Sequence, residues 1–429
     1  MSKKNKELPA GKKTAKEPMS QKEKRSFIIK AVAAGLAFIA ALVSFGLFAK
    51  QCTDKEAGWY SIDPNTDEFA PRYASGVSLQ YYFGGESEDN RVAMNAVRAK
   101  YSEALAHIFK LLDPQNAYEG YTNLHYLNTH PGEGVELDPV LFDILKDALA
   151  QTEAGGFDLF GGALFYEWQG VTILEDPQDF DPALDPDEKE RIDRLAALNS
   201  DRSNFSLEIV DENHHIVRFN VSEDYMAALE ELEISCPVLD LGYLKEAYEL
   251  VYTAGQLEEA GYHNGFLTTE SGLTLAMSGS DKGVFLLYSI ANNEPHQAAR
   301  VAMKGGSACC CWRSFPLEEG EPQYYTVTGE GGALMRHPHF DPATGEIGSE
   351  VLSVCVVDEK GDLPSACAAA NRLICSGAEE ARGTAKAESS ATRLAAYVLV
   401  SDTMTVNIDS AHASSITLTE GFPFRQETF

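Results

Sequence analysis

Three groups of residues in this sequence have types and spacings that could support chemistry, and two of them are polar. The run from Asp179 to Asp187 is rich in carboxylates, and paired carboxylates carry the acid–base chemistry of glycosidases. Such carboxylates must be buried and separated, whereas this run has the composition of a solvated acidic loop that could at most bind a cation. His337 and His339 flank Pro338 and could form a metal pair, but no third ligand is close in sequence, so we interpret them as loop histidines.

A third group consists of the consecutive cysteines Cys309, Cys310 and Cys311. Neighbouring residues of a strand point to opposite faces, so the three thiols cannot all reach one metal ion. No C-x-x-C spacing occurs in the chain, and free cysteines are commonly buried. We therefore interpret them as small buried residues. Eight cysteines among 429 residues do not indicate a disulfide framework.

The distribution of charge divides the chain sharply. The first 30 residues hold ten Lys and Arg against three Asp and Glu, and the remainder holds 25 against 62. A domain so acidic repels phosphate backbones, which excludes nucleic acid as a direct partner. The hydrophobic content of 44% indicates that most of the chain buries a core.

An apolar segment near the N-terminus predicts a membrane anchor. Residues 31–49 carry no charge over nineteen positions, a length that as a helix spans most of a bilayer. The cationic residues before it place the tail in the cytoplasm and the rest outside. The alternatives are a cleaved signal peptide, which has a shorter apolar region, and a lipoprotein, for which Lys50 and Gln51 before Cys52 form a poor signal. We predict a disordered basic cytoplasmic tail at 1–26, one transmembrane helix at 27–50 in the cell membrane, a linker at 51–75 and an extracytoplasmic domain at 76–429.

Helices and strands are intermixed in the outer part without a regular βαβ rhythm, which predicts an α+β fold. Apolar residues at three- and four-residue steps predict a helix at 87–112, and Asp138 and Pro139 begin another one. A further helix is predicted at about 244–260 and a last one at about 366–375. Strands are expected at 76–83, 205–210, 215–221, 265–276, 284–290, 351–357, 395–400 and 404–408.

Five segments occur in an order that resembles one known family. They are the opening GVSLQYYFGG, then FDLFGGALFYEW (157–168), LDLGYLKEAY (239–248), HFDPATGEI (339–347) and SACAA (365–369). This order is similar to that of the FAD:protein FMN transferases, the ApbE family, from about residue 76 to residue 408. The resemblance implies an ApbE-like flavin-transferase fold preceded by the transmembrane helix.

The family resemblance implies an extracytoplasmic enzyme that binds FAD as its substrate. With Mg²⁺ such an enzyme transfers FMN to a Thr or Ser of a target protein, here a possible acceptor flavoprotein of the membrane. The cation would neutralise charge on the pyrophosphate, and its ligands should be oxygen atoms.

The resemblance also assigns roles to residues of this sequence. Lys245 and Asp341 would be catalytic, and Asp341 would organise its loop. The flavin-binding residues would be Asp240, Gly242, Tyr243, Glu246, Gly272, His339, Thr344 and Gly345. The metal would be held by Ser365, Asp362 and the Lys245 carbonyl.

Several of the family's positions are altered in this chain. Tyr243 replaces a glycine, and Glu246 replaces a lysine while Lys245 lies one place early, which on a helix rotates it by about 100°. Ser365 replaces the metal-binding Asp and Ala369 replaces a Thr, so no carboxylate remains at that position.

One further segment and one further position differ from the family's pattern. Glu270-Ser271-Gly272 replaces the family's GGD, and Pro338 replaces a His. Two hypotheses follow. The chain is either an active transferase or a non-catalytic module that binds a flavin or a protein partner on the same fold.

Overall fold

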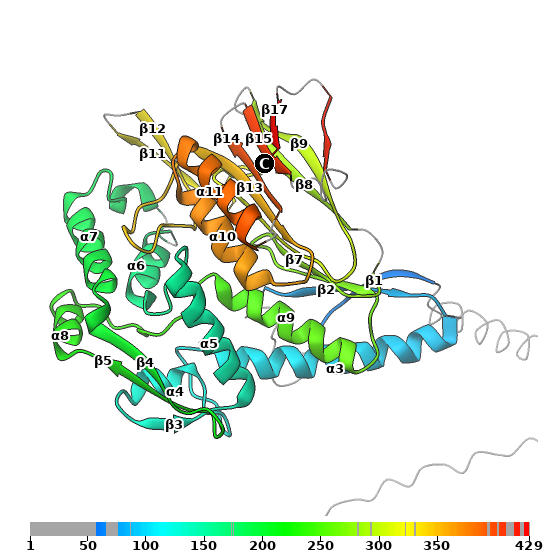
Figure 1. The fold of residues 1–429 in the computed structure, drawn as a ribbon, viewed down its shortest axis with the longest axis horizontal. Coiled ribbons are helices and arrows are strands. Elements are labelled where there is room, and N and C mark those ends of the chain that lie inside the picture. Colours follow the sequence, from blue (N-terminus) through cyan, green and yellow to red (C-terminus); the bar gives the residue numbers. More distant parts are fainter. Residues whose placement is uncertain are drawn as a thin grey trace, which may run out of the picture. The chain divides into compact units, whose positions relative to one another are not determined.

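Strands and helices alternate irregularly along the chain in this computed structural model (Figure 1). The structure describes residues 57–428 except 66–75, 86, 173, 175, 281–282, 292–293, 322, 330–331, 393–394, 401–402, 409–415 and 421–423. Residues 57–84 and 92–429 belong to one compact unit, which holds every contact described below.

The strands are β1 (Gly58–Ile62), β2 (Ser78–Phe83), β3 (Gly134–Glu136), β4 (Phe205–Asp211), β5 (Ile216–Val221), β6 (Gly265–Thr268), β7 (Leu273–Ala276), β8 (Gly283–Ala291), β9 (Glu294–Met303), β10 (Ala308–Arg313), β11 (Tyr325–Gly329), β12 (Gly332–Arg336), β13 (Val351–Asp358), β14 (Ala395–Val400), β15 (Thr403–Ile408), β16 (Ile416–Leu418) and β17 (Phe424–Thr428). The helices are α3 (Ser87–Leu112), α4 (Leu124–Thr129), α5 (Pro139–Ala154), α6 (Gly162–Thr172), α7 (Pro186–Ser200), α8 (Glu223–Glu231), α9 (Leu244–Glu259), α10 (Leu363–Cys375) and α11 (Ala378–Thr392), with short 3₁₀ turns η1 (Pro177–Phe180) and η2 (Arg202–Asn204).

A nine-stranded sheet, in the order β1-β2-β6-β7-β10-β13-β14-β15-β17, forms the centre of the unit. All its neighbouring strands pair antiparallel except β15 and β17, which are parallel. Mostly antiparallel pairing needs no regular helical crossovers, and the mixed order of helices and strands confirms the α+β prediction.

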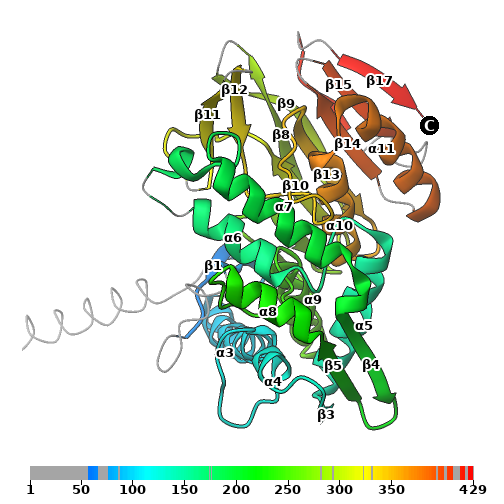
Figure 2. The ribbon, with the colours of Figure 1, turned by 90° about the vertical axis from the view of Figure 1, so that its left-hand side faces the viewer.

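Two apolar cores lie on the two faces of this sheet (Figures 1 and 2). The larger core packs the sheet against helices that include α3, α5, α9 and α10. The smaller core lies between β7, β10 and β13 of the large sheet and the three-stranded sheet β16-β9-β8. Buried residues in the middle of β10 and β13 therefore alternate between the two cores.

The two longest predicted helices form as the periodicity indicates. Helix α3 begins and ends at the predicted residues, and α9 runs from 244 to 259. Apolar side chains at three- and four-residue steps, such as Val97, Tyr101 and Leu105, are fully buried. The Tyr101 hydroxyl donates a hydrogen bond to the Val77 carbonyl oxygen at 2.9 Å, so its polar atom is satisfied inside the core.

Some predicted elements differ in the structure. The expected strand at 265–276 is a hairpin of β6 and β7, because Gly272 turns the chain with a φ of +96°. Helix α11 follows the predicted last helix. Strand β1 lies within the predicted linker at 51–75 and pairs with β2, so the folded unit begins before residue 76.

Among the residues that the structure describes, no helix is long and apolar enough to cross a bilayer. The predicted tail at 1–26 and transmembrane helix at 27–50 lie outside the described residues.

The acidic run at 179–187 is not wholly solvated as predicted, because Asp181 is fully buried. Its carboxylate accepts two hydrogen bonds of 2.8 Å from the Arg336 guanidinium and one of 2.9 Å from the Tyr325 hydroxyl. These hydrogen bonds connect the loop after η1 to β11 and β12. Both oxygen atoms of the Asp181 carboxylate are engaged, so neither is free for catalysis.

We predict that Asp181→Ala lowers the free energy of unfolding by about 3–5 kcal/mol, because the buried Arg336 charge loses its partner. Chemical denaturation of the wild type and the variant measures the difference. Asp179→Ala, at an exposed position of the same run, is the control and should change stability by less than about 0.5 kcal/mol. Equal effects of the two substitutions would contradict the assignment.

Candidate functional site

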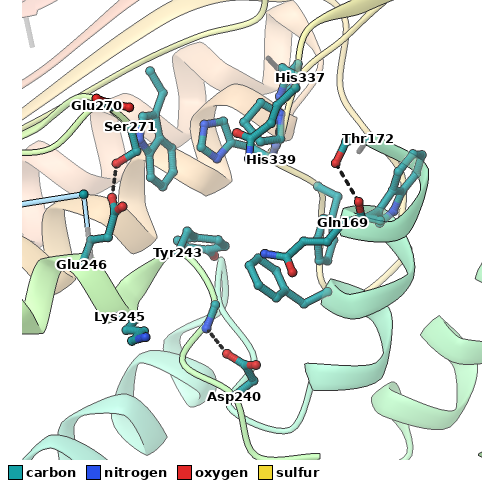
Figure 3. Close-up of a pocket in the computed structure, with 18 of the residues that line it drawn as sticks. Gln169, Thr172, Asp240, Tyr243, Lys245, Glu246, Glu270, Ser271, His337 and His339 are labelled. Carbon is teal, nitrogen blue, oxygen red and sulfur yellow. Dashed lines mark hydrogen bonds between the residues drawn. The ribbon is translucent and has the colours of Figure 1, made fainter. Parts of the chain in front are cut away.

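A cavity of about 660 Å³ lies where α9 begins (Figure 3). Its wall also includes α6, the turn between β6 and β7, the end of β10 and the loop that follows β12. This volume is within the usual range for small-molecule and cofactor sites. Of the residues with predicted roles, the cavity wall includes Asp240, Gly242, Tyr243, Lys245, Glu246 and His339.

The entry into α9 is held by a short polar network. Asn128 accepts hydrogen bonds from the backbone N–H groups of Val238 and Leu239, at 3.0 and 2.8 Å. The Asp240 carboxylate then accepts from the Gly242 N–H at 2.8 Å, and Gly242 has a φ of +48°. Burial raises the pKa of Asp240. Asp240 therefore acts as a turn former whose carboxylate is already engaged by the backbone.

Tyr243 projects into the cavity (Figure 3). Its ring meets Trp312 edge-on at 5.3 Å and Phe157 at 5.9 Å. The hydroxyl is buried and has no hydrogen-bond partner among the described residues. Burial raises its pKa well above the usual range, and Cys367, Arg372 and Cys375 of α10 also act on it electrostatically. The ring thus fills space between the start of α9 and α10.

His337 and His339 lie in the loop after β12, as predicted, but both are buried. His339 stacks on Trp312 at 3.8 Å, and neither its Nδ1 nor the Trp312 Nε1 has a hydrogen-bond partner among the described residues. His337 Nε2 lies 2.8 Å from the Gly348 carbonyl oxygen, and its Nδ1 accepts from the His339 N–H. Burial lowers the pKa of His337 to about 4 and that of His339 well below its usual value, so both rings are neutral at pH 7.

Acidic side chains dominate the charge of the cavity wall. Lys245 and Arg313 are its two cations, and the six carboxylates belong to Asp113, Asp240, Glu246, Glu249, Glu270 and Glu321. Both cations are already engaged. Lys245 Nζ lies 3.9 Å from Glu249 and 4.4 Å from the centre of the Phe109 ring. Arg313 pairs with Glu321 and donates to the Tyr324 hydroxyl at 3.2 Å.

Glu249 is the most unusual of these carboxylates. It is fully buried, and neither of its oxygens has a hydrogen-bond partner among the described residues. Burial raises its pKa to about 8, although Lys245 acts in the opposite direction. Neighbouring Glu246 hydrogen-bonds the Ser271 hydroxyl, and burial raises its pKa too (Figure 3). At neutral pH Glu249 is therefore mostly protonated and can donate a hydrogen bond into the cavity.

The oxygens predicted to hold Mg²⁺ make hydrogen bonds within the protein. Asp362 and Ser365 are not part of the cavity wall. The Asp362 carboxylate accepts from the Ser365 N–H and caps α10, and the Ser365 hydroxyl accepts from Gln151 Nε2 at 2.9 Å. The Lys245 carbonyl lies inside the hydrogen-bonded body of α9. The Asp358 carboxylate lies next to them and accepts from the Asp362 N–H at 2.9 Å, so it too is engaged by the backbone.

Four other predicted residues also lie outside the cavity wall. Asp341 organises its loop: its carboxylate accepts from the Ala343 N–H, and its carbonyl accepts from the Gly345 N–H. Thr344 accepts from the Glu346 N–H, and Gly345 accepts from Trp168 Nε1 at 2.8 Å. Gly272 packs against the Cys311 carbonyl, where a Cβ would be only 2.2 Å away. The geometry gives these residues structural contacts outside the cavity wall.

Sequence reasoning missed Glu249, Trp312 and Arg313 as residues of this cavity. Glu249 had a signal, because it follows Lys245 by four residues on a helix and so shares its face. No local sequence pattern indicated Trp312 and Arg313, because their positions depend on the pairing of β10 with distant strands.

The fold is that of the ApbE flavin transferases, which confirms the resemblance at the level of structure. The flavin transferase ApbE from Vibrio cholerae matches 80% of this chain and 94% of its own, with a TM-score of 0.51 and 13% identity. The ApbE protein from Thermotoga maritima matches 85% of this chain and 98% of its own, with a TM-score of 0.53 and 18% identity. No protein-family model matches the sequence. No curated protein matches it either.

Glu249 makes stability depend on pH. The folded state keeps the proton of Glu249 up to about pH 8, whereas the unfolded chain releases it near 4.5. Folding then requires proton uptake between these values, so this residue lowers stability as pH rises. We predict that Glu249→Gln gains roughly 2–4 kcal/mol relative to wild type between pH 5 and pH 8.

Denaturant titrations of both proteins at several pH values measure this gain. Glu259→Gln, at an exposed position of the same helix, is the control and should follow the wild type at every pH. A difference between Glu249→Gln and wild type that stays constant with pH would contradict the assignment.

Proposed function

We propose that this protein binds the isoalloxazine ring of a flavin in the cavity and does not carry out Mg²⁺-dependent FMN transfer. The observation that carries the proposal is the group formed by Tyr243, Trp312 and His339. Three aromatic rings in mutual contact each present a buried polar atom with no hydrogen-bond partner among the described residues. A flavin has a flat apolar face and an edge of donors and acceptors, which complements such a wall.

Buried polar atoms without partners are costly, and this cost supports a bound ligand. The Trp312 Nε1 and Tyr243 hydroxyl can donate, and His339 Nδ1 can donate or accept according to its tautomer. Protonated Glu249 adds a donor at the same cavity. Carbonyl oxygens and ring nitrogens of an isoalloxazine would satisfy these groups.

The charges of the cavity argue against a pyrophosphate in it. A pyrophosphate would face the carboxyl groups of six acidic residues, of which only Glu249 is mostly protonated. Arg313 is already paired with Glu321, and Lys245 already interacts with Asp240 and Glu246. Ser365 and Asp362, two of the predicted metal ligands, lie outside the cavity wall, so they would not hold a cation there to offset this repulsion. We therefore propose that affinity falls from riboflavin to FMN to FAD. The second candidate function, FAD:protein FMN transfer, is favoured by the fold alone.

Quenching of flavin fluorescence by the whole chain in detergent tests the proposal. We expect riboflavin to bind at least about tenfold more tightly than FAD, with the same affinities in EDTA and in Mg²⁺. His339→Ala and Trp312→Ala should each weaken riboflavin binding about tenfold or more, because each removes stacking area and a polar partner. Tyr166→Ala, at an exposed aromatic residue of α6 outside the cavity wall, is the matched control.

Three results would contradict this proposal. Riboflavin that fails to bind would exclude a flavin site. Riboflavin that binds the His339 and Trp312 variants as tightly as wild type would place it elsewhere. Mg²⁺-dependent conversion of FAD into AMP and FMN bound covalently to a protein would establish the transferase instead.

We also propose that residues 27–50 anchor the chain in the cell membrane with the domain outside the cytoplasm, as the charge-free segment and its cationic flank indicate. The chain should remain with membranes after an alkaline carbonate wash, and protease added outside intact cells should digest the domain. Deletion of residues 27–50 should release it from the membrane. Recovery of the full chain in the wash would contradict the anchor.

A further inference from the structure

Three thiols from two strands converge on the face of the large sheet that lies opposite the helices. Cys309 and Cys311 are two residues apart on β10, so they share a face, and Cys311 lies directly opposite Cys355 on antiparallel β13. The Sγ atoms of Cys311 and Cys355 are 3.0 Å apart, and each lies 3.4 Å from that of Cys309. The three sulfur atoms therefore form a nearly equilateral triangle.

The prediction that the consecutive cysteines cannot share one metal ion holds for Cys310. Burial raises the pKa of Cys310 and its hydrogen-bond partner is Cys367 of α10, on the side of the larger core. The partner that completes the triangle, Cys355, lies 44 positions from Cys311 in sequence. Only the pairing of β10 with β13 brings it there.

The surroundings of the triangle are apolar. Cys309 and Cys355 belong to the smaller core, together with residues such as Leu287, Val301 and Met303. Cys309 and Cys355 are fully buried, whereas Cys311 is partly exposed and gives access from outside. Among the residues that the structure describes, these three make up the one group of His, Cys, Asp or Glu whose ligand atoms all lie within 4.8 Å of one another.

Hydrogen bonding among the thiols makes them unequal. Bonds with Cys309 and Cys355 lower the pKa of Cys311 to about 5. Cys309 keeps its proton because the bond with Cys311 raises its pKa, and Cys355 keeps its proton mainly because it is buried. The geometry is independent of this order of pKa values: three sulfur atoms within 3.4 Å of one another can all bind one metal ion.

We propose that Cys309, Cys311 and Cys355 bind one Cu(I) ion. Thiolates select soft ions, and a site of three sulfur atoms without a hard fourth ligand suits Cu(I) better than Zn²⁺, which in structural sites has four ligands. The sulfur atoms need to separate by less than about 1 Å to admit an ion at a metal–sulfur distance of ~2.3 Å. Each thiol that becomes a ligand releases its proton to solvent. This site is independent of the flavin proposal.

The test uses the whole chain in detergent, reduced and kept free of oxygen. Cu(I) supplied as its acetonitrile complex is added in excess, and a Cu(I) chelator then removes loosely held metal. We expect one Cu(I) per chain to remain and to produce ultraviolet sulfur-to-copper charge-transfer absorption. Cys311→Ser, at the partly exposed position, should lose the ion, and Cys236→Ser, at a partly exposed cysteine outside the triangle, should keep it.

Circular dichroism of Cys311→Ser checks that the variant is folded. If it is not, Cys311→Ala takes its place in the same assay. Absence of retained Cu(I) in the wild type, or equal retention by the Cys311 variant, would overturn the proposal. Tighter retention of Zn²⁺ than of Cu(I) would overturn the choice of ion. A loss of two free thiols in air, with no Cu(I) retained under reduction, would identify a redox pair instead.

Discussion

The position at which α9 begins is the constraint on which the cavity depends. The Asp240 carboxylate accepts a hydrogen bond from the Gly242 N–H, and Asn128 accepts from the N–H groups of Val238 and Leu239. These bonds fix the orientation of the first turn of the helix. Gly242, Lys245, Glu246 and Glu249 then follow at three- and four-residue steps and lie along one side of the helix. A different start would rotate the side chains of Lys245, Glu246 and Glu249 out of the cavity wall.

The acidic wall and the space filled by Tyr243 make this cavity less suited to the pyrophosphate of a dinucleotide than to a neutral ring. Tyr243 fills space beside α10, and both cations of the wall already interact with acidic side chains. The same wall suits a neutral aromatic ligand, since desolvation favours the protonated form of Glu249 and the neutral form of His339. On this fold the cavity of the present chain is aromatic, and the oxygen atoms expected to bind a cation form other contacts.

Local patterns in the sequence predicted the parts of the fold that local physics determines. Helices α3 and α9 were predictable because the apolar residues of their buried faces recur every three or four positions within one continuous segment. The loop at 179–187 was misjudged because the partner of Asp181 is Arg336, more than 150 residues away. Cys355 and Trp312 reach their sites only through strand pairing. Half of the site residues predicted from the family resemblance line the cavity, and the others, such as Gly272 and Asp341, support loops.

Strand β10 is a wall shared by two unlike compartments. The side chains of Cys310 and Trp312 point toward the helices and the aromatic cavity. Those of Cys309 and Cys311 point to the opposite face, where they form the thiol triangle with Cys355. Sliding this strand by one position against β13 would exchange the two sets. An insertion or deletion of a single residue within β10 would therefore disable both compartments at once, while point substitutions can alter either compartment and leave its neighbour intact.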